Sequence, residues 1–474
     1  MEFDKDLSAR QEARDLARQA QSAAQQLRAM SQDQLDAITQ AVARRFSQKA
    51  EELAALAVEE TGFGNAADKT TKNRFASETV LDAIRDMRCV GVLSEDPQRK
   101  LWSIGVPVGV IAAIVPSTNP TSTVCYKALI ALKSGNAIIF SPHPNALQCT
   151  RKAAQIVAEA AQSAGAPAGA VSCLQLGAMA GTQELMHTPE VKLILATGGP
   201  GMVRAAYSSG KPAIGVGAGN GPAYIHPSAD FHRALDCILR SKNFDFGTVC
   251  ASEQSIIIQR CCEDRLLDTA KTKGFYFMST SEADALAKLL FKPGGGLSPD
   301  VVGKSAEHLA RIAGFSVPSG TNILVARADK VGPKHPYSME KLCPVLALFV
   351  EESEDAVLKK SVEILSHEGS GHTFSIHAAD TDTIRRFALA MPVSRFLVNT
   401  PAALGGIGYS TGLFPALTLG CGAVGGSSSS NNISPMDLIN IRMVAWDQET
   451  VGKKPDVEAD LVQLLTSKIL ERLR

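Results

Sequence analysis

The sequence has no net charge and no long apolar run. Lys plus Arg and Asp plus Glu each total 48, so the chain lacks the global positive field that attracts nucleic acid or an anionic membrane. No apolar stretch approaches the length that crosses a bilayer. The N-terminal segment MEFDKDLSARQEARDLARQAQ is too charged for a secretory signal. We therefore expect a soluble, cytoplasmic protein that binds a small ligand, with no membrane or nucleic-acid partner.

The ten cysteines lack the dense, regular spacing of a secreted disulfide framework. No C-x-x-C pair is present, so the pattern does not indicate a zinc site, and a reducing cytosol is the compartment it favours. A chain of 474 residues is roughly three times a typical domain. It is therefore long enough to form a cleft between domains.

Strand-like and helix-like segments alternate through most of the chain. After a helical region from about residue 3 to 60, the apolar run 108–116 predicts a strand, 127–136 a helix and 137–140 a second strand. The same order recurs as far as Val398. This alternation predicts parallel βαβ units and a doubly wound sheet, in which ligands bind beyond the carboxyl ends of the strands.

The segment FDFGTVCASEQS places Cys250 between a Gly-Thr turn and a run of small polar residues. A thiol becomes a useful nucleophile where its surroundings favour the thiolate. A free cysteine in an apolar setting is more often a small packing residue. The motif alone leaves both interpretations open.

Three other stretches supply context for this cysteine. IVPSTNPTST (114–123) carries Asn119 in a polar turn, where its amide is able to donate to an oxyanion. ATGGPGMVRAA (196–206) predicts a strand, a glycine turn and a helix start, suited to a phosphate or a nicotinamide ring. It lacks the G-x-G-x-x-G spacing of a Rossmann fingerprint. In GVGAGNGPAYI (215–225) the glycines allow close approach of the backbone to a ligand.

These motifs, followed by MEKLCPVLALF (339–349), HEGSGHTFSIH (367–377) and TLGCGAVGGSSSSNNISPMDLINI (418–441), are similar in order to those of the coenzyme A-acylating aldehyde dehydrogenases. That group includes enzymes that make acetyl-CoA or propionyl-CoA inside bacterial microcompartments and the aldehyde domain of bifunctional alcohol/aldehyde enzymes. The resemblance covers about residues 20–446.

The resemblance implies an α/β protein with the aldehyde dehydrogenase fold, which has a doubly wound nicotinamide-binding domain, an α/β catalytic domain and a small β oligomerisation flap. A homodimer or homotetramer is expected. The implied division is a dinucleotide-binding domain over 1–220 with a flap segment near 88–108, a catalytic domain over 221–418, and a return segment with an oligomerisation strand over 419–447.

The resemblance also implies the roles of individual residues. Cys250 is the expected nucleophile, and Asn119 and the Cys250 main-chain amide are the expected oxyanion donors. His372 either acts on the coenzyme A thiol or is structural. Glu340 is expected to hold the nicotinamide ribose. The other residues expected to line the NAD cofactor are Pro116, Ser141, Pro142, His143, Thr197, Gly198, Gly199 and Gly217.

Departures from the wider superfamily indicate which acceptor is used. Hydrolytic members carry a glutamate general base where this sequence has GVGAGN, which contains no acid. A coenzyme A thiol needs less base assistance than water, so thiolysis is favoured. Ser141 replaces the lysine that holds the adenosine ribose, which leaves the preference between NAD and NADP open.

The sequence therefore predicts oxidation of acetaldehyde or propionaldehyde, with NAD and coenzyme A, to acyl-CoA and NADH. One alternative is the same chemistry on sulfoacetaldehyde or another functionalised aldehyde. Another is a redox-silent cysteine acyltransferase, and a third is a non-catalytic scaffold, for which Cys250, Asn119 and Glu340 would be unnecessary.

The end of the chain differs from the rest. Residues 448–460 are polar and predict a linker, and 461–474 predict a short helix with apolar residues at four-residue steps. Those residues are Leu461, Leu465, Ile469 and Leu473. Tethered helices of this kind resemble encapsulation peptides, which bind microcompartment shell proteins through an apolar face. Docking on the same subunit and a disordered end are the alternatives.

Overall fold

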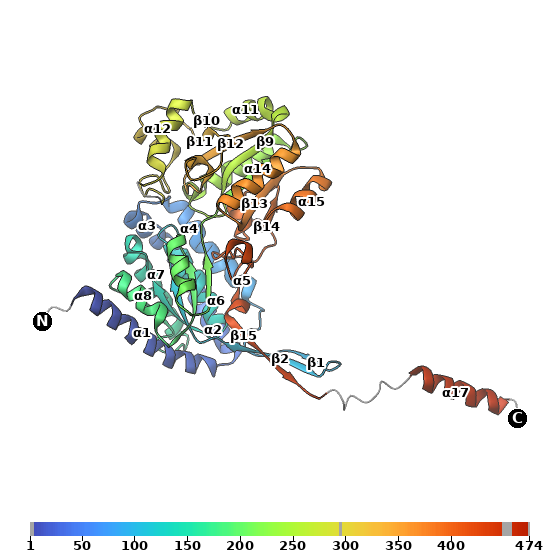
Figure 1. The fold of residues 1–474 in the computed structure, drawn as a ribbon. Helices are drawn as coiled ribbons and strands as arrows, with labels where there is room; N and C mark the ends of the chain where they lie inside the picture. Colours follow the sequence, from blue (N-terminus) through green and yellow to red (C-terminus); the bar gives the residue numbers. More distant parts are fainter. Residues whose placement is uncertain (1–3, 293–295, 448–456, 473–474) are drawn as a thin grey trace.

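Two parallel sheets and one small antiparallel sheet organise the computed structural model, which describes residues 4–292, 296–447 and 457–472. The two parallel sheets form separate lobes, one above the other, and the antiparallel sheet projects from the lower lobe (Figure 1). Most of the expected linker, residues 448–456, lies outside the described residues.

The lower lobe contains a five-stranded parallel sheet in the order β5-β4-β3-β6-β7. Its strands are β3 (Val110–Ile114), β4 (Ala137–Ser141), β5 (Val171–Cys173), β6 (Val191–Thr197) and β7 (Ala213–Val216). Every residue of β3 and β4 is buried, as expected for strands covered on both faces. The direction of strand addition reverses between β3 and β6, which is the switch point where doubly wound sheets bind ligands.

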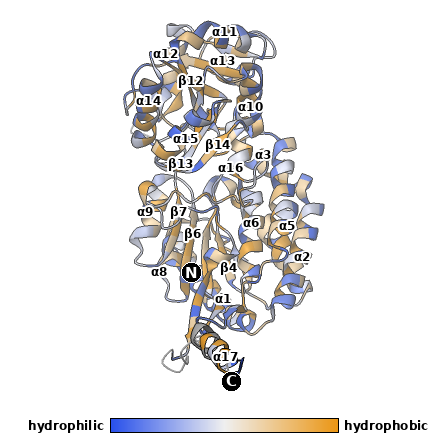
Figure 2. Ribbon diagram, turned by 90° about the vertical axis from the view of Figure 1, so that its right-hand side faces the viewer, coloured by the Kyte–Doolittle hydropathy of each residue, from blue (hydrophilic) through white to orange (hydrophobic). Residues whose placement is uncertain are grey.

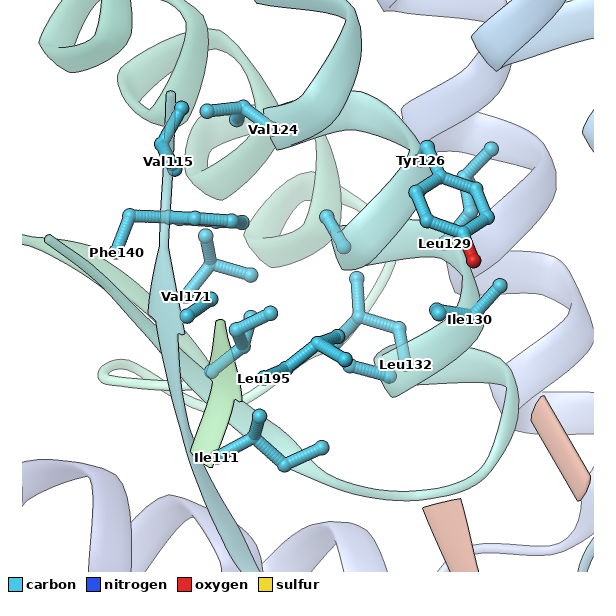
Figure 3. Packing of buried hydrophobic residues seen from close by; sticks show 14 of the residues in the cluster. Ile111, Val115, Val124, Tyr126, Leu129, Ile130, Leu132, Phe140, Val171 and Leu195 are labelled. Carbon is cyan, nitrogen blue, oxygen red and sulfur yellow. The ribbon is translucent and has the colours of Figure 1, made fainter. Parts of the chain in front are cut away.

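Helix α6 (Pro120–Lys133) is buried along its whole length beside this sheet. Figure 3 shows its apolar side chains packed with those of the strands, among them Leu132 of α6 and Ile111 of β3. The other helices of this lobe are α1 (Lys5–Arg28), α2 (Gln32–Gln48), α3 (Ala50–Thr61), α4 (Ala66–Arg74), α5 (Val80–Ile84), α7 (Leu147–Ser163), α8 (Met179–His187) and α9 (Pro200–Ser208).

The upper lobe contains a seven-stranded parallel sheet in the order β10-β11-β12-β9-β8-β13-β14. Its strands are β8 (Gly221–Ile225), β9 (Glu253–Gln259), β10 (Phe275–Phe277), β11 (Ile323–Arg327), β12 (Val345–Glu351), β13 (Gly371–His377) and β14 (Val393–Val398). The helices are α10 (Phe231–Asn243), α11 (Glu263–Lys271), α12 (Thr280–Leu290), α13 (Ala306–Ile312), α14 (Glu354–His367), α15 (Thr381–Ala390) and α16 (Ala402–Gly406).

The antiparallel sheet joins distant parts of the sequence. Strand β2 (Leu101–Pro107) pairs with β1 (Gly91–Asp96) on one side and with β15 (Ile439–Ala445) on the other. The rings of Trp102 and Trp446 meet edge to face with centroids 5.0 Å apart. Together with Ile441 and Met443 they leave a band of exposed apolar side chains, which is unusual for a sheet that functions alone in water.

Helix α17 (Val457–Arg472) begins four residues before the expected start at Leu461. It stands apart from both lobes (Figure 1) and mixes apolar and polar residues (Figure 2). Its exposed apolar side chains are Val462, Leu464, Leu465, Ile469 and Leu470. None of the helices in the described ranges combines the length and apolarity that a membrane crossing requires.

The predicted α/β fold with parallel sheets is confirmed. One element differs in its start, because α6 begins at Pro120 rather than near residue 127. Asn119 occupies the N-cap and Pro120 the first helical position, where the fixed φ of proline suits a helix start and its missing N–H costs nothing. The earlier start places Asn119 directly at the helix N-terminus.

Candidate active site

The residues expected to line the dinucleotide gather at one edge of the five-stranded sheet. They end or directly follow β3, β4, β6 and β7 at the carboxyl ends of these strands. Pro116 follows β3, Ser141, Pro142 and His143 lie at the end of β4, Thr197, Gly198 and Gly199 at the end of β6, and Gly217 follows β7. The fold thus brings together residues that are up to 101 positions apart.

The glycine turn after β6 leaves open space for a ligand. A Cβ atom placed on Gly199, Gly201 or Gly217 would meet no atom within 4 Å. Gly199 is the N-cap of α9 and provides no side-chain cap, so the helix N-terminus is able to receive a phosphate. The residues therefore fit a dinucleotide. Ser141 is an exception, because its buried hydroxyl contacts Thr182 Oγ1 at 2.8 Å and faces the protein.

A strained turn presents Cys250. Asp245, Phe246 and Gly247 all have left-handed backbone conformations, with φ of 51°, 50° and 78°, and two of the three are not glycine. Such strain costs of order 1–3 kcal/mol for each non-glycine residue and persists only where the surroundings hold it in place. The turn places Cys250 three residues before β9, where its side chain packs against the core of the lower lobe.

The Cys250 thiol is protonated in the free protein at neutral pH. The residue is partly exposed, but burial of its sulfur, together with Glu340 and Cys421, raises the pKa to about 12 against the opposing effect of Arg395. The main-chain amide of Cys250 also favours the thiolate. Formation of the nucleophile therefore depends on charge that arrives or develops when ligands bind.

Asn119 lies against the segment that carries Cys250. Its Nδ2 atom donates to the main-chain oxygen of Thr248 at 2.9 Å. Its Oδ1 atom accepts from Lys72 Nζ at 2.6 Å. The amide nitrogen therefore faces the nucleophile loop, which is the orientation that an oxyanion donor needs.

His372 is fully buried in β13. Its Nδ1 atom contacts Thr373 Oγ1 at 2.8 Å, and its Nε2 atom has no hydrogen-bond partner. Burial lowers the pKa of the imidazole to about 3, with Arg395 acting in the same direction, so the ring is neutral near pH 7. A Cβ on Gly219 would lie 2.1 Å from the Cys250 main-chain oxygen and 3.2 Å from His372 Cε1. The imidazole therefore approaches the Cys250 backbone at a position that only glycine fits.

Glu340 brings a carboxyl group to the same place. Its Oε1 atom accepts from the main-chain N–H of Gly219 at 2.9 Å. The glycine-dense segment contains no acid, yet the fold supplies one from the loop before β12. Burial raises the pKa of Glu340 to about 8, and Glu368 raises it further. The group is therefore mostly protonated at pH 7, so in most molecules its carboxylate is not available there as a base for water activation.

The charge of Glu340 is expected to control the reactivity of Cys250 above pH 8. Below this pH the carboxyl is protonated, so Glu340→Gln changes little; above it, only the wild type carries a charge that raises the thiol pKa. We expect Cys250 in the variant to react with iodoacetamide roughly two- to tenfold faster at about pH 9 and at an equal rate at about pH 6.5. Mass spectrometry of the Cys250 peptide measures both rates without NAD. If wild type and Glu340→Gln reacted at equal rates at both pH values, the Glu340 charge would not control the reactivity of Cys250.

Sequence reasoning missed a buried group of three residues beside the site, which we call the lysine–aspartate cluster: Lys69, Lys72 and Asp245. The Nζ atoms of both lysines contact Asp245 Oδ2, at 2.9 and 2.6 Å, and the three side chains are at most 3% exposed. The spacing of the lysines puts them on one face of α4. Nothing in the local sequence distinguishes these lysines from solvated ones.

Residues 5–275, more than half of the chain, match the model of the aldehyde dehydrogenase family. The chain belongs to this family, which confirms the family expected from the motifs. The bifunctional aldehyde-alcohol dehydrogenase of Escherichia coli is 44% identical over 442 residues, which cover 92% of this chain and 49% of that protein. The chain thus spans about half the length of this curated relative.

Solved structures agree over nearly the whole chain. An acetylating aldehyde dehydrogenase from Geobacillus thermoglucosidasius has a TM-score of 0.93 at 44% identity, covering 96% of this chain and 100% of that one. A propionaldehyde dehydrogenase from a Clostridium phytofermentans fucose utilisation microcompartment has a TM-score of 0.83 at 28% identity, covering 91% and 96%. The Rhodopseudomonas palustris propionaldehyde dehydrogenase with bound CoA and an acylated cysteine has the same TM-score and identity, covering 92% and 97%.

Proposed function

We propose that this chain oxidises a short aliphatic aldehyde, acetaldehyde or propionaldehyde, with NAD and coenzyme A to form acyl-CoA and NADH. One observation carries the proposal. The fold brings together Cys250, the Asn119 amide with its nitrogen toward the Cys250 loop, and the segment 215–220, which contains no acidic residue. The acylated cysteine of the Rhodopseudomonas relative supports the same chemistry.

The first step is addition of the Cys250 sulfur to the aldehyde carbonyl carbon. The S–C bond forms, the thiol proton leaves to solvent, and the carbonyl oxygen becomes an oxyanion. Asn119 Nδ2 and the Cys250 main-chain N–H stabilise this charge. In the free protein Asn119 Nδ2 donates to the Thr248 main-chain oxygen at 2.9 Å and to Thr118 Oγ1 at 3.3 Å, so it exchanges one of these contacts for the oxyanion. The residues that hold the reacting groups therefore lie on both lobes.

NAD, when bound, accepts the hydride and thereby takes two electrons from the adduct. The residues that would hold it are the glycine turn at Gly198 and Gly199, the backbone at Gly217, and Glu340 for the nicotinamide ribose. The C–H bond breaks, the carbonyl forms again, and Cys250 is left as a thioester.

Release of the acyl group uses the sulfur of coenzyme A. Its thiolate attacks the thioester carbon, the same donors hold the second oxyanion, and the Cys250 sulfur leaves and regains a proton. Because burial lowers the pKa of His372 to about 3, the imidazole is too weak a base to take the proton of the incoming thiol, which favours the structural role for His372 and loss of the thiol proton to solvent. One thioester replaces another, so the free-energy change of this step is small and the overall reaction is reversible.

The direct test is NADH formation over a panel of acetaldehyde, propionaldehyde and sulfoacetaldehyde, with and without coenzyme A. Steady turnover should require coenzyme A; without it, a single burst of about one NADH per subunit is expected because the thioester accumulates. Steady turnover in the absence of coenzyme A would show hydrolysis instead. Acyl exchange without any NADH would favour the acyltransferase.

We further propose that the exposed band on β2 and β15 joins subunits and that α17 binds a microcompartment shell protein. The exposed apolar side chains of both elements support this, since each lacks a partner within the described chain. The Clostridium relative comes from a microcompartment. An apolar helix face of this kind fits a groove on a partner protein.

Removal of the tail should separate encapsulation from catalysis. A chain that ends at Asp447 is expected to keep its specific activity but to lose co-sedimentation with recombinant microcompartment shells. The full-length double variant Leu465→Asp and Ile469→Asp should behave in the same way, because charge on the apolar face opposes burial in a groove. Unchanged co-sedimentation of both proteins would refute the proposal.

A further inference from the structure

We propose that Lys72 is a positioning residue that fixes the Asn119 amide for oxyanion stabilisation, with Asp245 holding Lys72 in place. The inference rests on the proposed function, because it assigns Lys72 a part in that reaction. Lys72 touches neither the nucleophile nor the expected ligands and acts only through Asn119.

The contacts of Lys72 account for all of its donor capacity. Its Nζ atom lies 2.6 Å from Asn119 Oδ1, 2.6 Å from Asp245 Oδ2 and 3.2 Å from Thr248 Oγ1. The side chain is 2% exposed. An ammonium has three protons and no acceptor, so these three oxygens use its donors, and the Thr248 main-chain oxygen lies farther away at 3.4 Å. The arrangement links the N-cap of α6 to the Cys250 loop through one buried cation.

This cation decides which way the Asn119 amide points. The oxygen and nitrogen of an asparagine amide are similar in size, and a half-turn about χ2 exchanges them. A lysine accepts no hydrogen bond, so it stabilises only the orientation that turns Oδ1 toward α4 and Nδ2 toward the Cys250 loop. The opposite orientation would place an amide N–H against an ammonium and leave the Cys250 main-chain N–H as the remaining expected donor for the oxyanion.

The cluster also places positive charge behind the oxyanion donor. Lys69 and Lys72 share one carboxylate, Asp245, and the only other facing acid among the described residues is Asp68, whose Oδ2 accepts from the Asp245 N–H at 2.8 Å. Burial lowers the pKa of Lys72 to about 8, against the opposing effect of Asp245. Lys72 is therefore cationic at neutral pH, and its charge strengthens the hydrogen bond that it donates to Asn119 Oδ1.

Lys69 provides a matched control within the same cluster. It is equally buried and contacts the same Asp245 oxygen, but its second partner is the Thr118 main-chain oxygen at 2.8 Å rather than the Asn119 side chain. Lys69→Met and Lys72→Met remove the same chemical group from the same carboxylate. Only the second removes the contact to the amide.

A double-mutant cycle with Asn119→Ala tests the assignment. We expect Lys72→Met to lower kcat about 10²–10³-fold with little change in the aldehyde KM. Adding Lys72→Met to Asn119→Ala should lower kcat less than threefold further, because the amide through which it acts is gone. The fold-loss in kcat caused by Lys69→Met should instead multiply with the fold-loss caused by Asn119→Ala, because Lys69 does not contact the Asn119 side chain. Independent, multiplicative effects of Lys72→Met and Asn119→Ala would overturn the proposal.

Two further readouts separate positioning from a general loss of structure. Iodoacetamide alkylation of Cys250 passes through no oxyanion, so its rate in Lys72→Met should stay within about twofold of wild type. The kcat ratio of wild type to Lys72→Met should fall as the pH rises through about 8, where the cation loses its charge. A large loss of alkylation, or a pH-independent ratio, would contradict positioning through Asn119. A wild type inactive on every aldehyde would instead refute the proposed function, whatever the variants do.

Discussion

Cys250→Ala is expected to lower NADH formation from any aldehyde by at least about 10⁴-fold. Alanine removes the only atom that is able to bond to the carbonyl carbon, and neither the Asn119 amide nor the cofactor residues replaces it. Residual hydride transfer from free aldehyde hydrate would be the sole remaining route. Turnover measured at saturating NAD and coenzyme A gives the loss directly.

The intermediate itself supplies an independent readout that needs no NAD. Wild-type protein incubated with acetyl-CoA should gain the mass of one acetyl group on the Cys250 peptide, because thiol exchange runs in both directions. Cys250→Ala should gain none. Cys173→Ala is the matched control, since Cys173 is a buried residue of β5 and its loss affects packing alone. A Cys250→Ala protein that still formed acyl-CoA would place the nucleophile elsewhere.

Asp245→Asn is expected to destabilise the folded protein by roughly 3–5 kcal/mol at about pH 7. The carboxylate is fully buried and contacts two buried ammonium groups, and asparagine keeps its size but removes its charge. The two lysines would then be buried without the Asp245 charge. Leaving buried charges unpaired costs more folding free energy than the intact ion pairs contribute. Urea unfolding followed by circular dichroism measures the loss.

The sign of the pH dependence distinguishes this cause from a packing defect. In the variant, loss of Asp245 lowers the folded-state pKa of Lys72 further below that of the unfolded chain, so the unfolded state binds more protons and stability rises with pH. The difference from wild type should therefore narrow as the pH rises toward about 8 and stay constant above it, because Lys72 then loses its proton in the wild type as well. Asp236→Asn is the control, because Asp236 pairs with Lys273 at the surface, where such pairs contribute about 1 kcal/mol or less. If Asp245→Asn lost no more stability than Asp236→Asn, the result would contradict a buried charge pair at Asp245.

The fold was predictable because its signals are local. The apolar runs at 108–116 and 137–140 are short, rich in β-branched residues and followed by helical segments, and they become β3 and β4. Hydrophobic periodicity and turn residues suffice for such units. The start of α6 was missed by seven residues because the Pro120 start signal lies in a polar turn.

The residues of the candidate site were partly predictable for a different reason. Asn119 and Cys250 stand in long motifs whose order identifies the family, although nothing in either segment alone fixes their roles. Asp245 stands in the same motif as Cys250, but nothing there indicates its partner, and Lys72 lies outside the quoted motifs. They are 173 positions apart, and only the contact between the lobes makes one the partner of the other.

The sequence by itself determined the alternation of strands and helices, which depends on residues near one another in the chain, and the family and the candidate nucleophile, which depend on the order of several motifs. The tertiary structure alone decided the electrostatics. Burial raised the pKa values of Cys250 and Glu340 and lowered that of Lys72. These shifts arise from the loss of water around each group and from charges supplied by distant segments, and a linear sequence contains neither.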